Sequence, residues 1–154
     1  MTNWLNPTEL SSWLSLAELV VKLPAALDAQ LQRDSGLSHF EYMVLARLSE
    51  APAQSLRMSS LAAISNGSLS RLSHVVKRLE QRGWVVREPC PEDGRYTNAI
   101  LTGTGREKVA AAAPGHVGAV RSLVIDRLDA DQLEALRAIC GRIAAGLPGS
   151  TCPE

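Results

Sequence analysis

Apolar residues recur at three- and four-residue steps near the start of the chain, which is the spacing of one helix face. This stripe comprises Leu10, Trp13, Leu14, Ala17, Val20, Val21, Leu27 and Leu31. It predicts a first helix over residues 7–33, capped by Asn6 and kinked at Pro24, which lacks a backbone donor. At roughly 1.5 Å per residue the helix is about 40 Å long. A helix of that length is too long for a compact monomer of this size and predicts a partner surface.

The pattern then changes to shorter helices separated by turns. Ser38 and Glu41 have the spacing of a capping box, which predicts a second helix ending at residues 51–53. We expect its buried side to consist of Phe40, Met43, Val44, Leu45, Ala46 and Leu48. A short extended piece at residues 56–58 should lead to a third helix at residues 61–64, capped by Ser59 or Ser60.

A turn at residues 65–67 precedes a fourth helix, which we expect to start at Ser68 and to end near Arg82, with Gly83 as its C-cap. Helical spacing puts Ser70, Ser73, His74 and Lys77 on one face, opposite Leu69, Leu72, Val76 and Leu79. Two short helices joined by a tight turn, with the second more basic, indicate a helix-turn-helix motif.

Two stretches with strand propensity follow, at residues 84–88 and 96–101. The connection between them, residues 89–95, is rich in turn residues and contains Asp93-Gly94. A hairpin directly after a recognition helix is a wing.

The remaining sequence predicts two further helices. One should start at Thr102 or Thr104 and end near Leu128, with a kink near Pro114. The last helix is expected to be capped by Asp129, with an apolar seam formed by Leu133, Leu136, Ile139, Cys140, Ile143 and Leu147. The predicted fold class is therefore mainly α with a small β-wing: a winged helix-turn-helix with long N- and C-terminal dimerisation helices.

The net charge of zero conceals a basic middle segment. Residues 57–87 carry six Lys or Arg against Glu80 alone, whereas residues 1–56 and 88–154 are net acidic. A basic segment between acidic ends is expected when only the middle of a chain meets phosphate, although solvated charged helix faces are also common.

Several other classes of protein find no support in the sequence. We find no catalytic or phosphate-loop motif, no cofactor motif and no His/Cys metal spacing, so neither an enzyme nor a cofactor is expected. Three cysteines without a CxxC pair fit a reducing compartment. The first eight residues do not resemble a secretory signal, and the most apolar run is interrupted by Lys22 and Pro24, so we expect a cytoplasmic protein.

The chain resembles the MarR family of bacterial regulators through motifs that occur in order along nearly its whole length. These are residues 61–64, 67–72, the Leu-Glu-x-Arg-Gly of residues 79–83, the Asp-Gly-Arg of residues 93–95 and the Leu-Thr-x-x-Gly of residues 101–105. The resemblance implies a single domain over residues 1–154, with a DNA-binding region at residues 37–101. It also implies a homodimer joined through residues 1–36 and 102–147.

For such a regulator the expected partners are double-stranded DNA and a second copy of the chain, with no membrane. Arg71 is the candidate for a bidentate contact to guanine, and Arg95 for insertion into the minor groove, with Asp93 holding either that arginine or the tight turn. The residues expected at bases or phosphates on the recognition helix are Ser68, Ser70, Ser73 and His74. The residues expected at phosphates alone are Arg57, Lys77 and Arg78.

The sequence leaves open how the protein is regulated. The resemblance implies a cleft for a small aromatic or anionic effector near Trp13, His39, Tyr42 and Met43, but core packing explains these residues equally well. Cys90 is expected to be exposed in the wing, near Arg87 and Arg95, where oxidation is a second route of regulation. A winged-helix scaffold for protein interactions that has lost DNA binding is the competing function.

Overall fold

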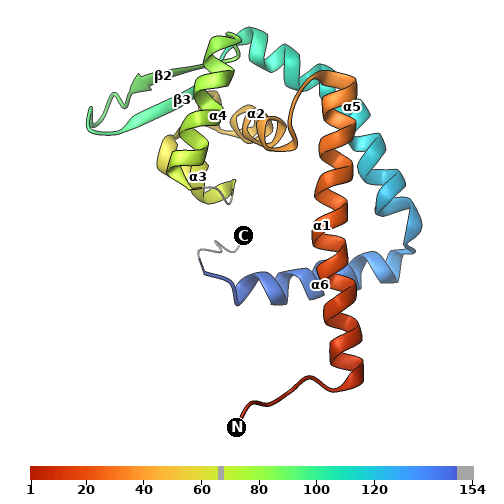
Figure 1. Cartoon of the computed structure of the whole chain (residues 1–154). Helices are drawn as coiled ribbons and strands as arrows, with labels where there is room; N and C mark the ends of the chain where they lie inside the picture. Colours follow the sequence, from red (N-terminus) through yellow and green to blue (C-terminus); the bar gives the residue numbers. More distant parts are fainter. Residues whose placement is uncertain (66–67, 149–154) are drawn as a thin grey trace.

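The computed structural model describes residues 1–65 and 68–148, within which helices predominate over a three-stranded antiparallel sheet (Figure 1). The helices are α1 (Pro7–Ser35), α2 (His39–Glu50), α3 (Met58–Ile64), α4 (Leu69–Gln81), α5 (Gly103–Leu123) and α6 (Ala130–Ala145). The strands are β1 (Ser55–Arg57), β2 (Val85–Pro89) and β3 (Thr97–Leu101). Short 3₁₀ turns, Pro52–Gln54 and Ile125–Arg127, follow α2 and α5. The predicted fold class is confirmed.

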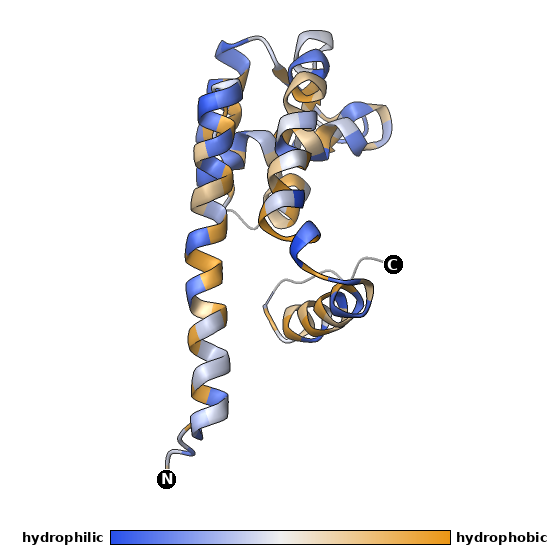
Figure 2. Ribbon diagram, turned by 90° about the vertical axis from the view of Figure 1, so that its right-hand side faces the viewer, coloured by the Kyte–Doolittle hydropathy of each residue, from blue (hydrophilic) through white to orange (hydrophobic). Residues whose placement is uncertain are grey.

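Helix ends that depend on local capping lie at the positions that the sequence predicts. Complete capping boxes start α1 at Asn6, α2 at Ser38 and α6 at Asp129. Gly83 follows α4 with a φ of 75°, a left-handed conformation that glycine adopts without strain. α1 continues through Pro24 as one helix, and α5 likewise continues through Pro114 (Figure 2).

Two helix boundaries differ from the prediction. α3 starts at Met58, before Ser59 and Ser60, and has no side-chain cap, because the buried Met58 side chain packs into the core from its first turn. α5 ends at Leu123, since Val124 leaves the helical conformation and the chain turns through Ile125–Arg127 into α6. Of the turn expected at residues 65–67, residues 66 and 67 lie outside the described residues, as does Cys152.

The sheet is short and its central strand is β3, with β1 and β2 on either side. β1 pairs with β3 through Leu56 opposite Ala99, and β2 pairs with β3 through Val86 opposite Ile100. The extended piece expected after α2 is therefore the third strand of the wing sheet.

One apolar core unites α2, α3, α4 and the sheet with the end of α1 and the first half of α5. Its fully buried members include Leu31, Leu37, Val44, Leu45, Leu48, Leu61, Leu72, Val76, Leu79, Val85 and Ala99. Burial of each large aliphatic side chain contributes about 1.5–3 kcal/mol. This core fixes the winged part of the chain.

The long helices extend beyond this core. α6 has no buried residue, and most residues in the first two thirds of α1 are exposed. Both helices extend away from the core, and apolar residues remain along them (Figures 1 and 2). By length and composition alone α1 contains an 18-residue window apolar enough to cross a membrane, although Lys22 and Pro24 were expected to interrupt it; 6% of that window is buried in the chain. Cys140, which the apolar seam of the last helix predicts to be buried, is exposed on α6 in the single chain.

The Leu-Thr-x-x-Gly motif forms the corner between β3 and α5. The Thr102 side chain caps α5 by accepting from Gly105 N and donates to Gly83 O, at 3.0 and 2.6 Å. A Cβ on Gly105 would lie 2.1 Å from the carbonyl oxygen of Trp84, which already accepts from Thr102 N. The close approach of two backbone segments thus explains why this motif ends in glycine.

We predict that Gly105→Ala destabilises the fold by about 1–3 kcal/mol, because neither backbone segment is free to move away from the added methyl group. Gly103→Ala is the matched control, since a Cβ there meets no atom within 4 Å and alanine favours the helix. Urea unfolding at one fixed protein concentration measures both. Equal stability of the two variants would contradict the packing argument.

Candidate nucleic-acid interface

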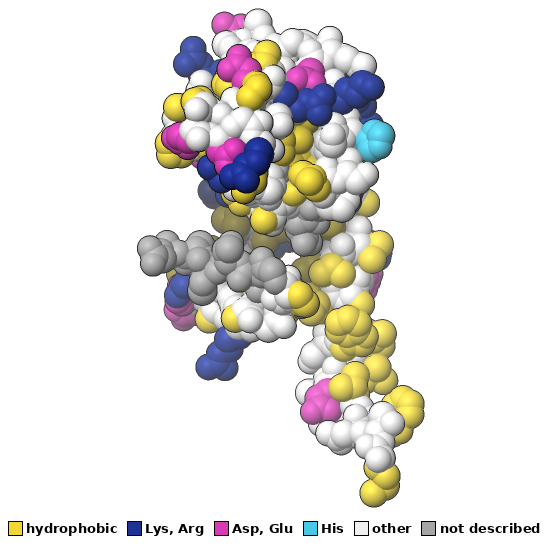
Figure 3. Space-filling model, turned by 90° about the vertical axis from the view of Figure 1, so that its left-hand side faces the viewer, with side chains coloured by type: hydrophobic (Ala, Val, Ile, Leu, Met, Phe, Trp, Pro, Cys, Tyr) yellow, Lys and Arg dark blue, Asp and Glu magenta, His cyan; other side chains and the backbone are white. Residues whose placement is uncertain are grey.

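α4 presents a polar face to solvent and an apolar face to the core. Leu72, Val75, Val76 and Leu79 are buried. Leu69, expected among them, is instead 54% exposed, and Val75 takes its place, so the buried stripe lies slightly further along the helix. The exposed residues of the helix and its cap are Ser68, Leu69, Ser70, Arg71, His74, Lys77, Arg78 and Gln81. Figure 3 shows Lys and Arg side chains gathered over the winged part.

The first wing strand is tied to α4 by an ion pair. Arg87 Nη2 lies 2.8 Å from Glu80 Oε2, and Arg87 N donates to Glu80 Oε1 at 2.9 Å. The same guanidinium donates to Ser73 Oγ at 3.4 Å, which leaves Ser73 half-buried between helix and strand. The wing and the recognition helix therefore hold a defined relative position.

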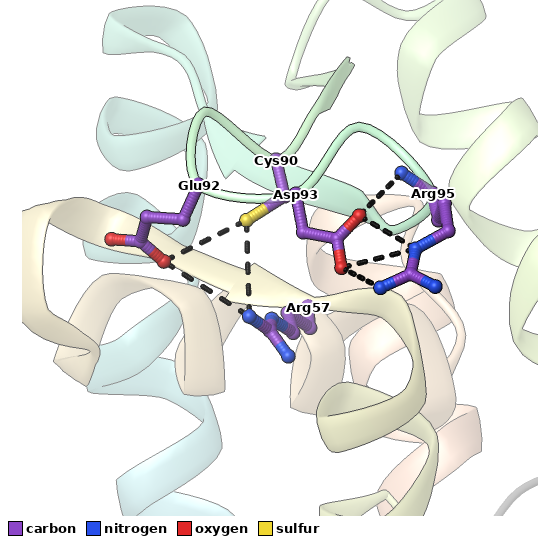
Figure 4. Close-up of polar contacts among 5 residues, drawn as sticks. All are labelled: Arg57, Cys90, Glu92, Asp93 and Arg95. Carbon is purple, nitrogen blue, oxygen red and sulfur yellow. Dashed lines mark hydrogen bonds and ion pairs between the residues drawn. The ribbon is translucent and has the colours of Figure 1, made fainter.

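The wing tip is organised around Asp93, as expected. Its carboxylate receives the Arg95 guanidinium through two oxygens, at 2.9 and 2.7 Å, and accepts from Arg95 N at 3.1 Å (Figure 4). These hydrogen bonds lower the pKa of Asp93 and raise that of Arg95. The Arg95 side chain remains 84% exposed. Asp93 therefore fixes the Arg95 guanidinium at the wing tip while leaving it accessible to solvent.

Arg57, expected to contact phosphate, instead contacts residues of the wing loop. Its guanidinium lies 4.6 Å from the centre of the Tyr96 ring. It also lies 4.0 Å from Glu92 Oε2 and 4.0 Å from Cys90 Sγ (Figure 4). Cys90 is 4% exposed, which corrects the expectation of an exposed thiol. The backbone amides of Asp93 and Glu92 lower its pKa, with a smaller effect of Arg57, whereas the expected neighbours were Arg87 and Arg95.

Two arginines of α4 contact α2. The Arg71 guanidinium carbon lies 4.6 Å from the centre of the Phe40 ring, a cation–π geometry. Arg78 Nε lies 3.3 Å from Glu41 Oε1. Both expected DNA-binding residues are therefore partly engaged within the chain, while His74 and Lys77 lie on the exposed face beside them.

A groove of about 1010 Å³ separates α4 from α1 and α2. His39, Phe40 and Met43 line one side, and Arg71 and His74 line the other. Tyr42 packs instead against His116 of α5, with ring centres 4.4 Å apart. Trp13 lies eleven residues before Pro24, the first groove residue, or about 16 Å along the helix. Of the four expected ligand residues, the groove contains His39 and Met43.

His116, which packs against Tyr42, also lies beside His39, with the two imidazole ring centres 5.7 Å apart. Burial lowers the pKa of both imidazoles; Asp28 opposes this at His39, and the charge of His39 adds to it at His116. Among the residues that the structure describes, no three His, Cys, Asp or Glu side chains lie close enough to hold a metal ion.

Sequence reasoning missed the long-range partners of this surface. The sequence pattern places Phe40 in the core and Glu41 in a cap. It predicts Arg87 as part of the basic segment and a neighbour of Cys90, without Glu80 as its partner. Glu80 is the single acid of the basic segment and also belongs to the Leu-Glu-x-Arg-Gly motif. Its isolation among basic residues and its place in that motif are the signals in the sequence that Glu80 has a specific partner.

The winged part matches the model of the MarR family over residues 37–97. Over nearly its whole length the chain is similar to Sco3205, a MarR family transcriptional regulator from Streptomyces coelicolor whose crystal structure contains DNA. The two are 46% identical, the match covers 96% of this chain and 92% of that chain, and the TM-score is 0.92.

Two curated relatives match shorter parts. YdcH of Bacillus subtilis, an uncharacterized HTH-type transcriptional regulator, is 32% identical over 80 residues, or 51% of this chain. The transcriptional repressor MprA of Escherichia coli is 24% identical over 109 residues, or 70% of this chain. The matches span 54% of YdcH and 62% of MprA.

Proposed function

The chain belongs to the MarR family of transcriptional regulators, and on that premise we propose that it is a sequence-specific repressor that binds a pseudo-palindromic operator as a homodimer in the cytoplasm. Family membership also confirms that it is a regulator and not an enzyme. The observation that carries the proposal is the exposed polar face of α4, held in fixed relation to the wing by Glu80 and Arg87.

In this proposal α4 enters the major groove with Ser70, Arg71 and His74 towards the bases, and Lys77 contacts phosphate. Ser68 caps the helix, and Ser73 connects it to Arg87. Arg95 enters the minor groove while Asp93 holds it. Arg57 and Arg78, which already lie against carboxylates, hold the wing and the helix instead.

Mobility-shift assays with the DNA upstream of its own gene test the function. We expect retention of this fragment at a protein concentration that leaves random-sequence DNA free. The scaffold alternative requires that no genomic fragment binds even at low salt.

Two substitutions on α4 separate base contacts from phosphate contacts. Arg71→Ala should cost about 1–3 kcal/mol on the operator and relax its discrimination, because a bidentate base contact is lost. Lys77→Ala should weaken binding to all sequences alike and lower the salt slope by about one. Equal losses on operator and random DNA for Arg71→Ala would assign Arg71 to phosphate.

We propose that the dimer forms through residues 1–36 and 102–147, as the exposed apolar surfaces of α1 and α6 support. Trp13 and Leu14 on α1 and Ile139 and Ile143 on α6 are about half exposed or more in the single chain. An apolar surface of this kind favours association, since its burial removes it from water. This assignment also places Trp13 at the interface instead of at a ligand.

Ile139→Glu should therefore dissociate the dimer, because it places a charge on the apolar seam of α6. Ala138→Glu, on the opposite side of the same helix, is the matched control and should leave the dimer intact. Light scattering at micromolar concentration should give twice the chain mass of 16.5 kDa for the wild type and the control. A monomeric wild type would refute the proposed interface.

We further propose that an aromatic carboxylate relieves repression by binding in the groove beside His39, Phe40 and Met43, near Tyr42. Arg71 lines that groove and stacks on Phe40, so a bound anion would compete with DNA for its guanidinium. A ligand changes an equilibrium only through different affinities for the two states.

A panel of aromatic carboxylates should lower operator affinity at fixed salt, and Phe40→Leu should reduce this effect. Fluorescence anisotropy of a labelled operator measures both. A panel that neither releases DNA nor raises thermal stability would refute the effector proposal and leave DNA binding standing.

A further inference from the structure

Glu41 is a carboxylate buried beneath the recognition helix. It belongs to the first turn of α2, and its side chain is 5% exposed. Oε2 accepts from Ser38 N at 2.9 Å, which completes the capping box. Oε1 lies 3.3 Å from Arg78 Nε, and Oε2 lies 3.9 Å from Arg82 Nη1. One carboxylate thus caps its own helix and faces two guanidinium groups of another.

These arginines lie one turn apart at the C-terminal end of α4. Arg82 also donates to Gly36 O at 3.1 Å and lies 5.1 Å from the centre of the Trp84 ring. The last turn of the recognition helix is therefore joined to the connection between α1 and α2. A buried charge needs its partners, because removing them leaves a desolvated charge uncompensated.

The pairing changes what this end of α4 offers to DNA. Arg78 directly follows Lys77, lies one turn beyond His74 and remains 57% exposed, so its guanidinium borders the proposed DNA-binding face. An unpaired arginine at this position would attract any phosphate. Contacts to phosphate add affinity without regard to sequence.

We propose that Glu41 is a positioning residue for sequence discrimination: it neutralises and orients Arg78 and Arg82, which keeps Arg78 off the phosphate backbone and holds α4 in register with the bases. This inference rests on the proposed DNA binding.

The test is Glu41→Gln, which removes the charge but preserves the size of the side chain and the capping-box hydrogen bond, since glutamine also serves at that position. Dissociation constants are measured over a salt series with a random-sequence duplex and with the fragment upstream of the gene. We expect tighter binding to random DNA, a salt slope steeper by about one, and a smaller ratio of specific to random affinity.

Two further variants isolate the cause. Glu134→Gln makes the same change of net charge at an exposed position on α6 and should leave the slope unchanged. Arg78→Gln alone should also leave the slope unchanged, whereas Glu41→Gln combined with Arg78→Gln should restore the wild-type slope.

Distinct results overturn the inference. If Arg78→Gln alone lowers the slope by about one and Glu41→Gln does not raise it, Arg78 already contacts phosphate. If Glu41→Gln lowers the melting temperature and weakens binding to both DNAs at an unchanged slope, its role is only structural. A wild type that prefers no fragment over random DNA would instead refute the proposed function.

Discussion

The burial of one side of α4 determines what the protein can present to DNA. Leu72, Val75, Val76 and Leu79 fill the core between α2, α3 and the sheet, and each contributes about 1.5–3 kcal/mol by its burial. Consecutive helical residues differ by about 100° in direction, so a rotation by one position would expose leucine and bury arginine. The polar face, the ion pairs and the groove all follow from this orientation of a single helix.

The winged part and the long helices solve separate packing problems. The winged part has a complete core within one chain, to which α1 contributes Leu31 and α5 contributes Val109. The exposed stretches of α1 and α6 have no such core among the described residues, and the proposed dimer would supply the surface that covers them. In the proposed dimer these helices set the spacing of two winged modules that are each already folded. The distance between the two winged modules can then change without disturbing the apolar core of either module.

The sequence was most informative where structure depends on neighbours three or four residues away. The capping boxes at Ser38 and Asp129 and the left-handed Gly83 were predictable because each needs only a short segment. The start of α3 at Met58 and the exposure of Leu69 depend on packing against distant residues. Cys90 shows the same limit: its thiol is buried because the wing loop folds over Arg57, which no local pattern announces. The partners of Arg71, Arg78 and Arg87 were unpredictable for this reason.

Much of the positive charge of the basic middle segment is already paired with carboxylates of the same chain. Its arginines at 57, 78, 82 and 87 face Glu92, Glu41 or Glu80, whereas Arg71 and Lys77 form no ion pair with residues that the structure describes. Operator affinity in the proposed complex would then depend on few contacts, so the loss of one matters. Arg71 stacks on Phe40 at the groove, and a coupling of about 1–3 kcal/mol between two sites changes affinity about 5- to 150-fold. In the proposed complex, carboxylates that restrain sequence-independent attraction would therefore also make operator binding more sensitive to a ligand in the groove.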